Sequence, residues 1–156
     1  MTTTDEALLL ASHLLKPYGG TESRPEPGRL DVSLPVDNLL AAAGALRAAE
    51  CGYLAAITGL DGGAPAGNLE VLYHFCEASA VITLRVSVPR SEPTVPSLAA
   101  LVPSASLYER ELSEMLGVTV SGSPNTDRLY LPDDWPANLY PLRKDAVLAG
   151  PPAPTG

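Results

Sequence analysis

The thiol and imidazole groups that this sequence offers to zinc or to an iron–sulfur cluster come from two cysteines and two histidines. Cys51 and Cys76 do not form a C-x-x-C pair, and neither His13 nor His74 has a cysteine pair nearby. Zinc and iron–sulfur sites need thiolates or imidazoles at close, recurring spacings. We therefore expect no metal and no cofactor in this chain, and two free thiols in a reducing compartment.

His74 and Arg85 fall on the same polar face of two predicted strands. One interpretation makes them a proton-transfer or ligand site. We favour the other, a solvated cross-strand cluster with Glu70, because catalytic histidines on strands are rare. The sequence has no clear Ser/His/Asp or Cys/His set, and Gly62-Gly63 precedes no helix that would complete a phosphate loop. No catalytic residue is predicted.

The segment from Ser106 to Gly117, SLYERELSEMLG, has the pattern of an amphipathic helix. Ser106 and Glu109 stand at capping-box spacing, so each side chain is able to satisfy the other residue's backbone N–H at the start of the helix. Gly117 is suited to cap the C-terminal end. We predict a helix that begins at Ser106.

Glu111 is the unusual residue of this helix. On a helical wheel it lies inside the apolar arc, between Leu107 and Met115. A carboxylate in that position is costly unless a cation or a hydrogen-bond donor meets it. The partner is either internal, with Arg85 or Arg110 as candidates, or supplied by another protein. A third interpretation is that the Glu111 carboxylate reaches solvent at the rim of its own domain.

The elements that must position these residues follow from periodicity. Helices are predicted over residues 5–16, 38–50 and 106–117, and strands over 30–36, 53–58, 69–75 and 81–88, with a turn-rich linker at 21–28. In the last two strands apolar and polar residues alternate, which is typical of an antiparallel sheet with one face on helices. We predict an α+β domain over residues 1–117, with helices on one face of a roughly four-stranded, mostly antiparallel sheet.

Residues 118–156 show no period long enough for a helix or a paired strand. They are nevertheless rich in large apolar residues, unlike most disordered tails. We interpret them as an extended arm that docks on another protein through aromatic and arginine anchors. The alternative is an arm that wraps its own domain.

Composition limits the class of protein. The chain has 156 residues, of which 46% are hydrophobic, a size that fits one domain with a modest core. A net charge of −8 argues against binding to a phosphate backbone. The start MTTTDEALLL lacks the basic segment of a signal peptide, and the apolar region 39–60 is interrupted by Arg47, Glu50 and Gly52. We expect a soluble protein, or one that reaches a membrane through a partner.

Several motifs in fixed order resemble one known family. They are GYLAAITGLDG, NLEVLYHF, ITLRVSVPR, YERELSEMLGV, SGSPNTDRLYLPDDWP and YPLRKD, which together span residues 53–145. This series resembles the 30-kDa subunit family of respiratory complex I, which includes matching subunits of membrane-bound group 4 [NiFe] hydrogenases. Two positions depart from the respiratory pattern, since Gly122-Ser123-Pro124 stands for G-H-P and Tyr140 for the histidine of H-P-L-R-K-D-F. These features, and a short chain, are more similar to the hydrogenase-type branch.

The resemblance implies a cofactor-free structural or assembly subunit in the hydrophilic arm of a membrane-bound redox complex, on the cytoplasmic side. Its partners would be a large catalytic subunit, with a [NiFe] or quinone site, and a small subunit with a [4Fe–4S] cluster. The residues expected to dock are Glu109, Arg110, Glu111, Arg128, Trp135, Tyr140, Arg143, Lys144 and Asp145. The alternatives are the C subunit of an NADH-quinone oxidoreductase and, from another class, a stand-alone small-ligand-binding α+β module.

Overall fold

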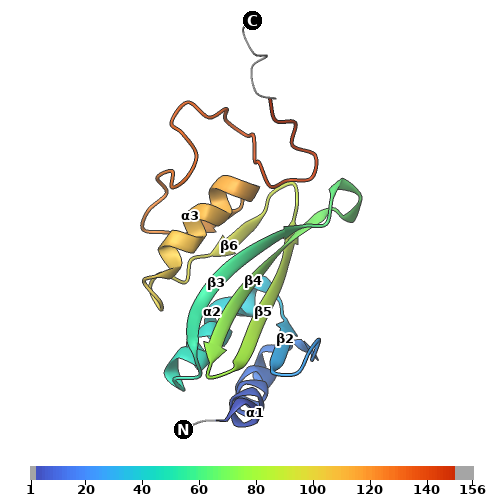
Figure 1. Ribbon diagram of the computed structural model, residues 1–156, viewed down its shortest axis with the longest axis vertical. Helices are drawn as coiled ribbons and strands as arrows, with labels where there is room; N and C mark the ends of the chain where they lie inside the picture. Colours follow the sequence, from blue (N-terminus) through green and yellow to red (C-terminus); the bar gives the residue numbers. More distant parts are fainter. Residues whose placement is uncertain (1–2, 150–156) are drawn as a thin grey trace, which may run out of the picture.

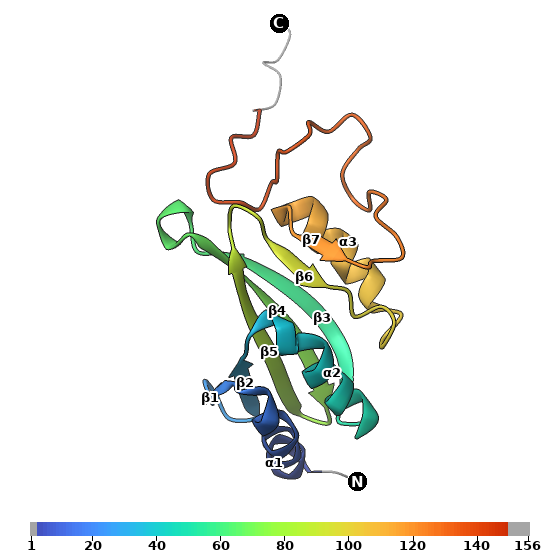
Figure 2. The same cartoon turned by 180° about the vertical axis from the view of Figure 1, so that it is seen from behind.

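Three helices cover one face of a five-stranded sheet in the computed structural model, which describes residues 3–149 (Figure 1). The helices are α1 (Thr4–Leu15), α2 (Leu39–Ala48) and α3 (Ala105–Leu116), and the 3-10 turns are η1 (Lys16–Tyr18), η2 (Val36–Asn38) and η3 (Ala64–Ala66). Seen from behind, α1 and α2 lie in front of the sheet (Figure 2), whereas no helix of residues 3–149 lies across the sheet face that is turned to the viewer in Figure 1. The predicted α+β fold is confirmed.

The sheet has one more strand than the roughly four predicted. Its order is β1 (Thr21–Ser23), β2 (Arg29–Ser33), β5 (Ala80–Pro89), β4 (Asn68–Glu77) and β3 (Tyr53–Asp61). Only the β2–β5 pair is parallel among these neighbours. The added strand, β1, lies in the segment 21–28 that we expected to be only a linker, because three residues are too few for a visible alternation.

The two faces of the sheet differ as the alternation predicts. Val71 and Tyr73 of β4 point to the helices and are at most 1% exposed, in register with Val86 and Leu84 of β5. Residues of α1, α2 and α3 belong to the same buried cluster as these side chains. The other face carries Glu70, His74 and Arg85, among others, and remains partly open to solvent.

A second, two-stranded sheet corrects the prediction that no paired strand follows residue 118. β6 (Thr94–Pro96) and β7 (Thr119–Ser121) are parallel, and Val118 and Val120 are buried in the core. The start of the predicted arm is therefore built into the domain. Three residues paired over a long sequence separation leave no periodic signal.

Helix α3 begins before the predicted residue. Ser104 is its N-cap and makes no side-chain capping bond, so Ser106 lies inside the first turn and the predicted capping box is wrong. The predicted C-terminal cap is confirmed, because Gly117 adopts the left-handed conformation with φ of 70°.

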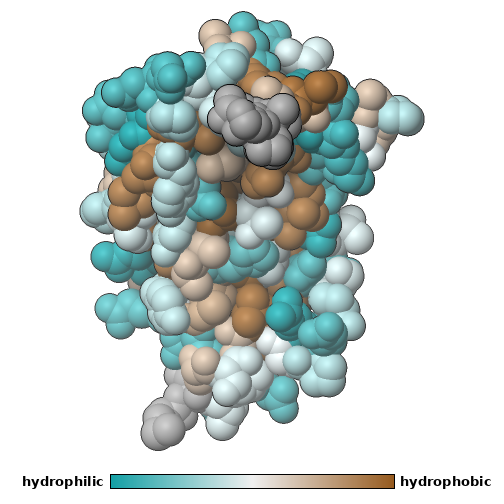
Figure 3. Space-filling view, turned by 45° about the horizontal axis from the view of Figure 1, so that its top comes forward, coloured by the Kyte–Doolittle hydropathy of each residue, from teal (hydrophilic) through white to brown (hydrophobic). Residues whose placement is uncertain are grey.

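From Gly122 onwards the described chain has no helix and no strand, and it runs back over α3 toward the far end of β3 and β5 (Figures 1 and 2). We call residues 122–149 the C-terminal arm. Hydrophobic residues reach the surface at this end of the molecule, between hydrophilic ones (Figure 3). The Pro-rich end of the chain, AGPPAPTG from Ala149, lies almost wholly outside the described residues.

Candidate functional site

Glu109 is the buried carboxylate of α3, with 2% of its surface exposed. Its Oε1 accepts a bond of 2.6 Å from the Leu98 amide, and its Oε2 accepts one of 2.8 Å from the Ser97 hydroxyl. These charge-assisted bonds satisfy the carboxylate inside the core and anchor the loop that precedes the helix. Burial, together with the negative charge of Glu109, raises the pKa of the Tyr73 phenol.

The outer side of α3 holds the C-terminal arm through Arg110 and Glu114, one helical turn apart. The Arg110 guanidinium donates to the carbonyls of Asp127 and Arg128 at 2.8 and 2.7 Å. The Glu114 carboxylate accepts from the amides of three successive arm residues, at 2.6, 2.9 and 3.4 Å, namely Leu129, Tyr130 and Leu131. These backbone groups of residues 127–131 are thus paired without a strand or a helix.

The middle of the arm is held by its own side chains. Arg128 donates to the carbonyls of Pro132 and Trp135 at 3.3 and 3.1 Å, and the Trp135 indole donates to the Leu139 carbonyl at 2.8 Å. This segment from 128 to 139 is a locally closed loop. Both predicted anchors, Arg128 and Trp135, are therefore occupied by contacts within the arm, while Arg128 remains exposed.

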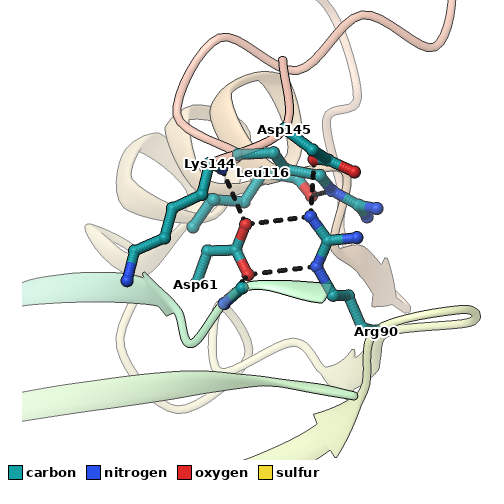
Figure 4. A network of polar contacts seen from close by, with 7 residues as sticks. Asp61, Arg90, Leu116, Lys144 and Asp145 are labelled. Atoms are coloured by element: carbon teal, nitrogen blue, oxygen red, sulfur yellow. Dashed lines mark hydrogen bonds and ion pairs between the residues drawn. The ribbon is translucent and has the colours of Figure 1, made fainter. Parts of the chain in front are cut away.

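A charge network fastens the end of the arm to the end of the sheet (Figure 4). Asp61, the last residue of β3, accepts two bonds of 3.0 Å from Arg90 and one of 2.8 Å from the Lys144 amide. Arg90 also pairs with Asp145 at 2.6 Å. The side chains of Asp61 and Arg90 are 1% and 13% exposed, so solvent screens their pair weakly.

The network perturbs the pKa of each of its charged groups. The hydrogen bonds from Arg90 hold the pKa of Asp61 well below its usual range, against the effect of burial, with help from the amides of Lys144 and Gly63. The bond from Arg90 likewise lowers the pKa of Asp145, and both carboxylates raise the pKa of Arg90. All three groups are charged at neutral pH.

Residues 140–143 cover the C-terminal end of α3. The Tyr140 ring lies against Gly117, where a Cβ would collide with it, and the Arg143 guanidinium lies 4.9 Å from the centre of that ring. Arg143 donates to the Leu116 carbonyl at 2.8 Å, and the Leu142 amide donates to the Met115 carbonyl at 3.0 Å. Carbonyls left open at a helix end are thereby satisfied by the arm.

Glu111 is partly buried beside β3, in a groove of about 160 Å³. The internal cations proposed for it have other partners. Arg85 pairs with Asp31 and Glu70, and Arg110 binds arm carbonyls. Within residues 3–149 no ion pair to Glu111 is found.

The predicted cluster on the open sheet face is present. Arg85 pairs with Glu70 at 2.8 Å and with Asp31 at 3.0 Å, across three strands. The His74 ring bonds to the hydroxyls of Thr83 and Thr58 at 3.1 and 3.0 Å. Burial lowers the pKa of His74, and Asp31 partly offsets this. These groups satisfy one another, as expected of a structural cluster.

Cys51 is buried and Cys76 half-buried, and both thiols are free. Burial raises the pKa of Cys51, which disfavours a reactive thiolate. In the part of the chain that the structure describes, no three His, Cys, Asp or Glu residues gather to hold a metal ion. The same residues include no helix long and apolar enough to cross a membrane.

The structure brings most of the predicted docking residues to one region, around α3 and the arm, but it also adds Asp61, Arg90 and Glu114. Sequence reasoning missed these three. Asp61 and Arg90 were detectable in principle from the register of the hairpins. Leu69 of β4 lies opposite Asp61 on one side and opposite Val88, two residues before Arg90, on the other. Glu114 had no such signal, since its partners are backbone amides of an irregular segment.

Residues 32–152 match a family model described as "Respiratory-chain NADH dehydrogenase, 30 Kd subunit". The chain belongs to this family. The resemblance noted from the motifs is thereby confirmed.

Relatives of this chain are named as a hydrogenlyase subunit in one case and as subunits of NADH-quinone oxidoreductases in others. Formate hydrogenlyase subunit 5 of Escherichia coli (strain K12) is 41% identical over 108 residues, which cover 67% of this chain and 19% of that protein. The C subunit of the NADH-quinone oxidoreductase of Herpetosiphon aurantiacus is 37% identical over 83 residues, covering 52% of this chain and 47% of that one. The chain thus spans half or less of the length of these relatives.

Solved structures agree on the fold. A chain of the membrane-bound sulfane sulfur reductase, an archaeal respiratory membrane complex, superposes with a TM-score of 0.76 at 23% identity, over 90% of this chain and 85% of that one. A trypsin-resistant fragment of Nqo5 gives a TM-score of 0.64 at 23% identity, over 79% of this chain and 99% of the fragment. At such identities the likeness concerns the fold of the 30 Kd subunit.

Proposed function

We propose that this chain is a cofactor-free structural and assembly subunit in the hydrophilic arm of a membrane-bound redox complex. It docks on a large catalytic subunit and on a small subunit that carries a [4Fe–4S] cluster, and it is peripheral, on the cytoplasmic side. Electrons pass through the neighbours. Membership of the 30 Kd subunit family supports this proposal.

The proposal that the chain docks on other subunits is supported by the C-terminal arm, which is held in place but exposes apolar side chains. Its backbone is held in place by Arg110, Glu114 and the Asp61 network, yet several of its large apolar side chains stay exposed. The exposed fractions are 65% for Tyr130, 60% for Leu142, 84% for Val147 and 49% for Leu148. An ordered segment that presents apolar and aromatic residues to solvent has the character of an interface.

Of the residues predicted to dock, the exposed ones retain that role in the proposal. They are Arg128, Lys144 and Asp145, with Glu111, Trp135, Tyr140 and Arg143 partly accessible. Glu109 and Arg110 act within the chain, on the loop before α3 and on the arm. We propose that Glu109 and Arg110 contribute to docking indirectly, by holding the surface in shape. Variants of these two residues should therefore weaken docking through a change in the structure of the chain.

The hydrogenase-type branch is the more specific form of the proposal. The match to formate hydrogenlyase subunit 5 covers 67% of this chain, against 52% to 62% for the C subunits of NADH-quinone oxidoreductases. Tyr140, in place of histidine, points the same way. The C subunit of an NADH-quinone oxidoreductase is the alternative, and its partner would carry a quinone site in place of a [NiFe] site.

The competing class, a stand-alone ligand-binding module on the open sheet face, has less support. Arg85, Asp31 and Glu70 already neutralise one another there, and His74 bonds to two threonines. A ligand would have to replace these internal bonds, each of which costs free energy to leave unmade.

The test is purification of the tagged chain from its native membranes under anaerobic conditions. We expect two further subunits to co-purify, with iron and sulfide in the ratio of at least one [4Fe–4S] cluster per complex. The same chain produced alone is the control and should bind no metal. Recovery of a monomer without partners would refute the proposal.

A further inference from the structure

Strand β3 is an edge of the sheet with unusually little protection. It pairs with β4 on one side, and no described strand pairs with the other. Natural edge strands are commonly short or guarded by lysine or proline. β3 has nine residues, YLAAITGLD, with no proline and no charge before Asp61. One bulge, between Leu54 and Ala56, interrupts the register, which is regular from Ala56 onwards.

Helix α3 packs against β3, and two of the three side chains in one stripe along the helix, Glu111 and Met115, share a groove with the strand. Leu107, Glu111 and Met115 follow one another at intervals of one turn, and Leu107 is 55% exposed. They are not the core side of the helix, which is formed by Leu112, Leu116 and others. The stripe is therefore a partly open face of the helix, on which Leu107 is exposed and Glu111 and Met115 are partly buried, with Leu142 of the arm beside them.

The surface between the strand and the helix is hollowed at both ends. A groove of about 160 Å³ lies among Ile57, Thr58, Gly59, Glu111 and Met115, with Leu142 of the arm. A larger one of about 400 Å³ borders the start of the strand, at Tyr53 and Leu54, and the loop before α3. We call the surface formed by the edge of β3 and the stripe Leu107–Glu111–Met115 the β3 trough.

The groups that line the β3 trough indicate the chemistry of the segment that would bind there. A strand edge is complemented by the backbone of another extended segment, through main-chain hydrogen bonds. The apolar stripe is complemented by apolar side chains on that segment. Glu111, which has no ion pair within residues 3–149, is complemented by a lysine or an arginine.

We propose that an extended segment of a partner subunit pairs with the edge of β3 as a sixth strand and places a basic side chain against Glu111. This inference rests on the proposed function and names the surface that it uses. The docked strand would also explain why an edge with so little protection is tolerated, because assembly removes it from solvent.

Hydrogen exchange tests the strand. Exchange is measured for the tagged chain alone and for the complex purified with it. Peptides covering residues 53–61 should exchange about tenfold or more slowly in the complex, because the outward amides of β3 gain partners. Peptides from the middle of β5, paired on both sides, are the internal control. A complex in which β3 exchanges as in the isolated chain overturns the β3 trough but not the proposed function, whereas failure to form any complex overturns both.

Variants of Glu111 test the charge. Glu111→Gln and Glu111→Lys should leave the melting temperature of the isolated chain nearly unchanged, since no internal pair is lost. The Lys variant should weaken binding to the co-purifying subunit on the order of 30-fold, the scale of a broken interfacial charge pair. Asp37→Asn, at an exposed carboxylate before α2, is the matched control. Wild-type binding by Glu111→Lys, or a melting temperature lowered by Glu111→Gln without a binding defect, overturns the proposal.

Discussion

Asp61, which the sequence analysis did not single out, links the end of the arm to the end of β3. Its carboxylate accepts bonds from Arg90, Lys144 and Gly63, and its side chain is 1% exposed. A neutral amide in its place would lose the ion pair and turn an N–H toward donors. We therefore expect Asp61→Asn to lower the free energy of unfolding by about 1–3 kcal/mol in denaturant titrations at pH 7.

The same substitution has a pH signature. The folded-state pKa of Asp61 lies below the ordinary aspartate value of 3.8, so the unfolded chain takes up the proton first as pH falls. The stabilisation is complete above that value and is lost as pH falls below it. Asp61→Asn should thus differ from the wild type at pH 7 and converge with it in acid, while Asp37→Asn should follow the wild type throughout.

His74 gives a second pH dependence, with its own window. Burial lowers its pKa below the ordinary 6.5, so the unfolded state binds the proton more readily. Stability therefore falls as pH drops below 6.5 and towards the folded-state pKa. His74→Gln, which retains a hydrogen-bonding side chain for Thr58 and Thr83, should flatten this slope. His13→Gln, at the exposed histidine of α1, should not, and an equal effect of both variants would contradict the account.

At the scale of elements, α3 links the arm to the domain, because Arg110 and Glu114 bind its backbone. Glu114→Gln would offer an N–H to amides that need an acceptor. We expect faster hydrogen exchange over residues 129–131 and little change in the melting temperature, since the arm lies outside the core. Glu111→Gln, on the same helix, is the control. Unchanged exchange in the Glu114 variant would mean that other contacts hold this segment.

Helices and long strands were predictable because their periodicity extends over many residues, as in β4 and β5. The short strands β1, β6 and β7 were not, because three residues carry no period and their partners are distant in sequence. The candidate site was likewise predictable only in part. Its location on α3 and YPLRKD was predictable from the motifs, whereas the Asp61–Arg90 pair depends on hairpin register and the Glu114 contacts on an irregular backbone.

At the scale of the whole molecule, the chain combines a two-layer domain with an arm that is fastened at both ends. The alternative that the arm wraps its own domain describes many of its contacts, from Arg110 to Asp61. Docking does not require a detached arm, because preorganised segments lose less entropy on binding. An arm that is fixed on its own domain, with apolar residues facing outward, is suited both to covering that domain and to docking on a partner.

The most direct test of docking is the affinity of the chain for the large subunit when outward arm residues are changed. A Tyr130→Asp and Val147→Asp double variant places charges on side chains that are 65% and 84% exposed. The matched control is Leu9→Asp with Leu40→Asp, at exposed leucines of α1 and α2. Circular dichroism should find both variants folded. We predict that the arm variant binds on the order of 30-fold more weakly, the scale of an interface hot spot, and that the control binds as the wild type. Equal binding by the arm variant and the wild type would contradict the account.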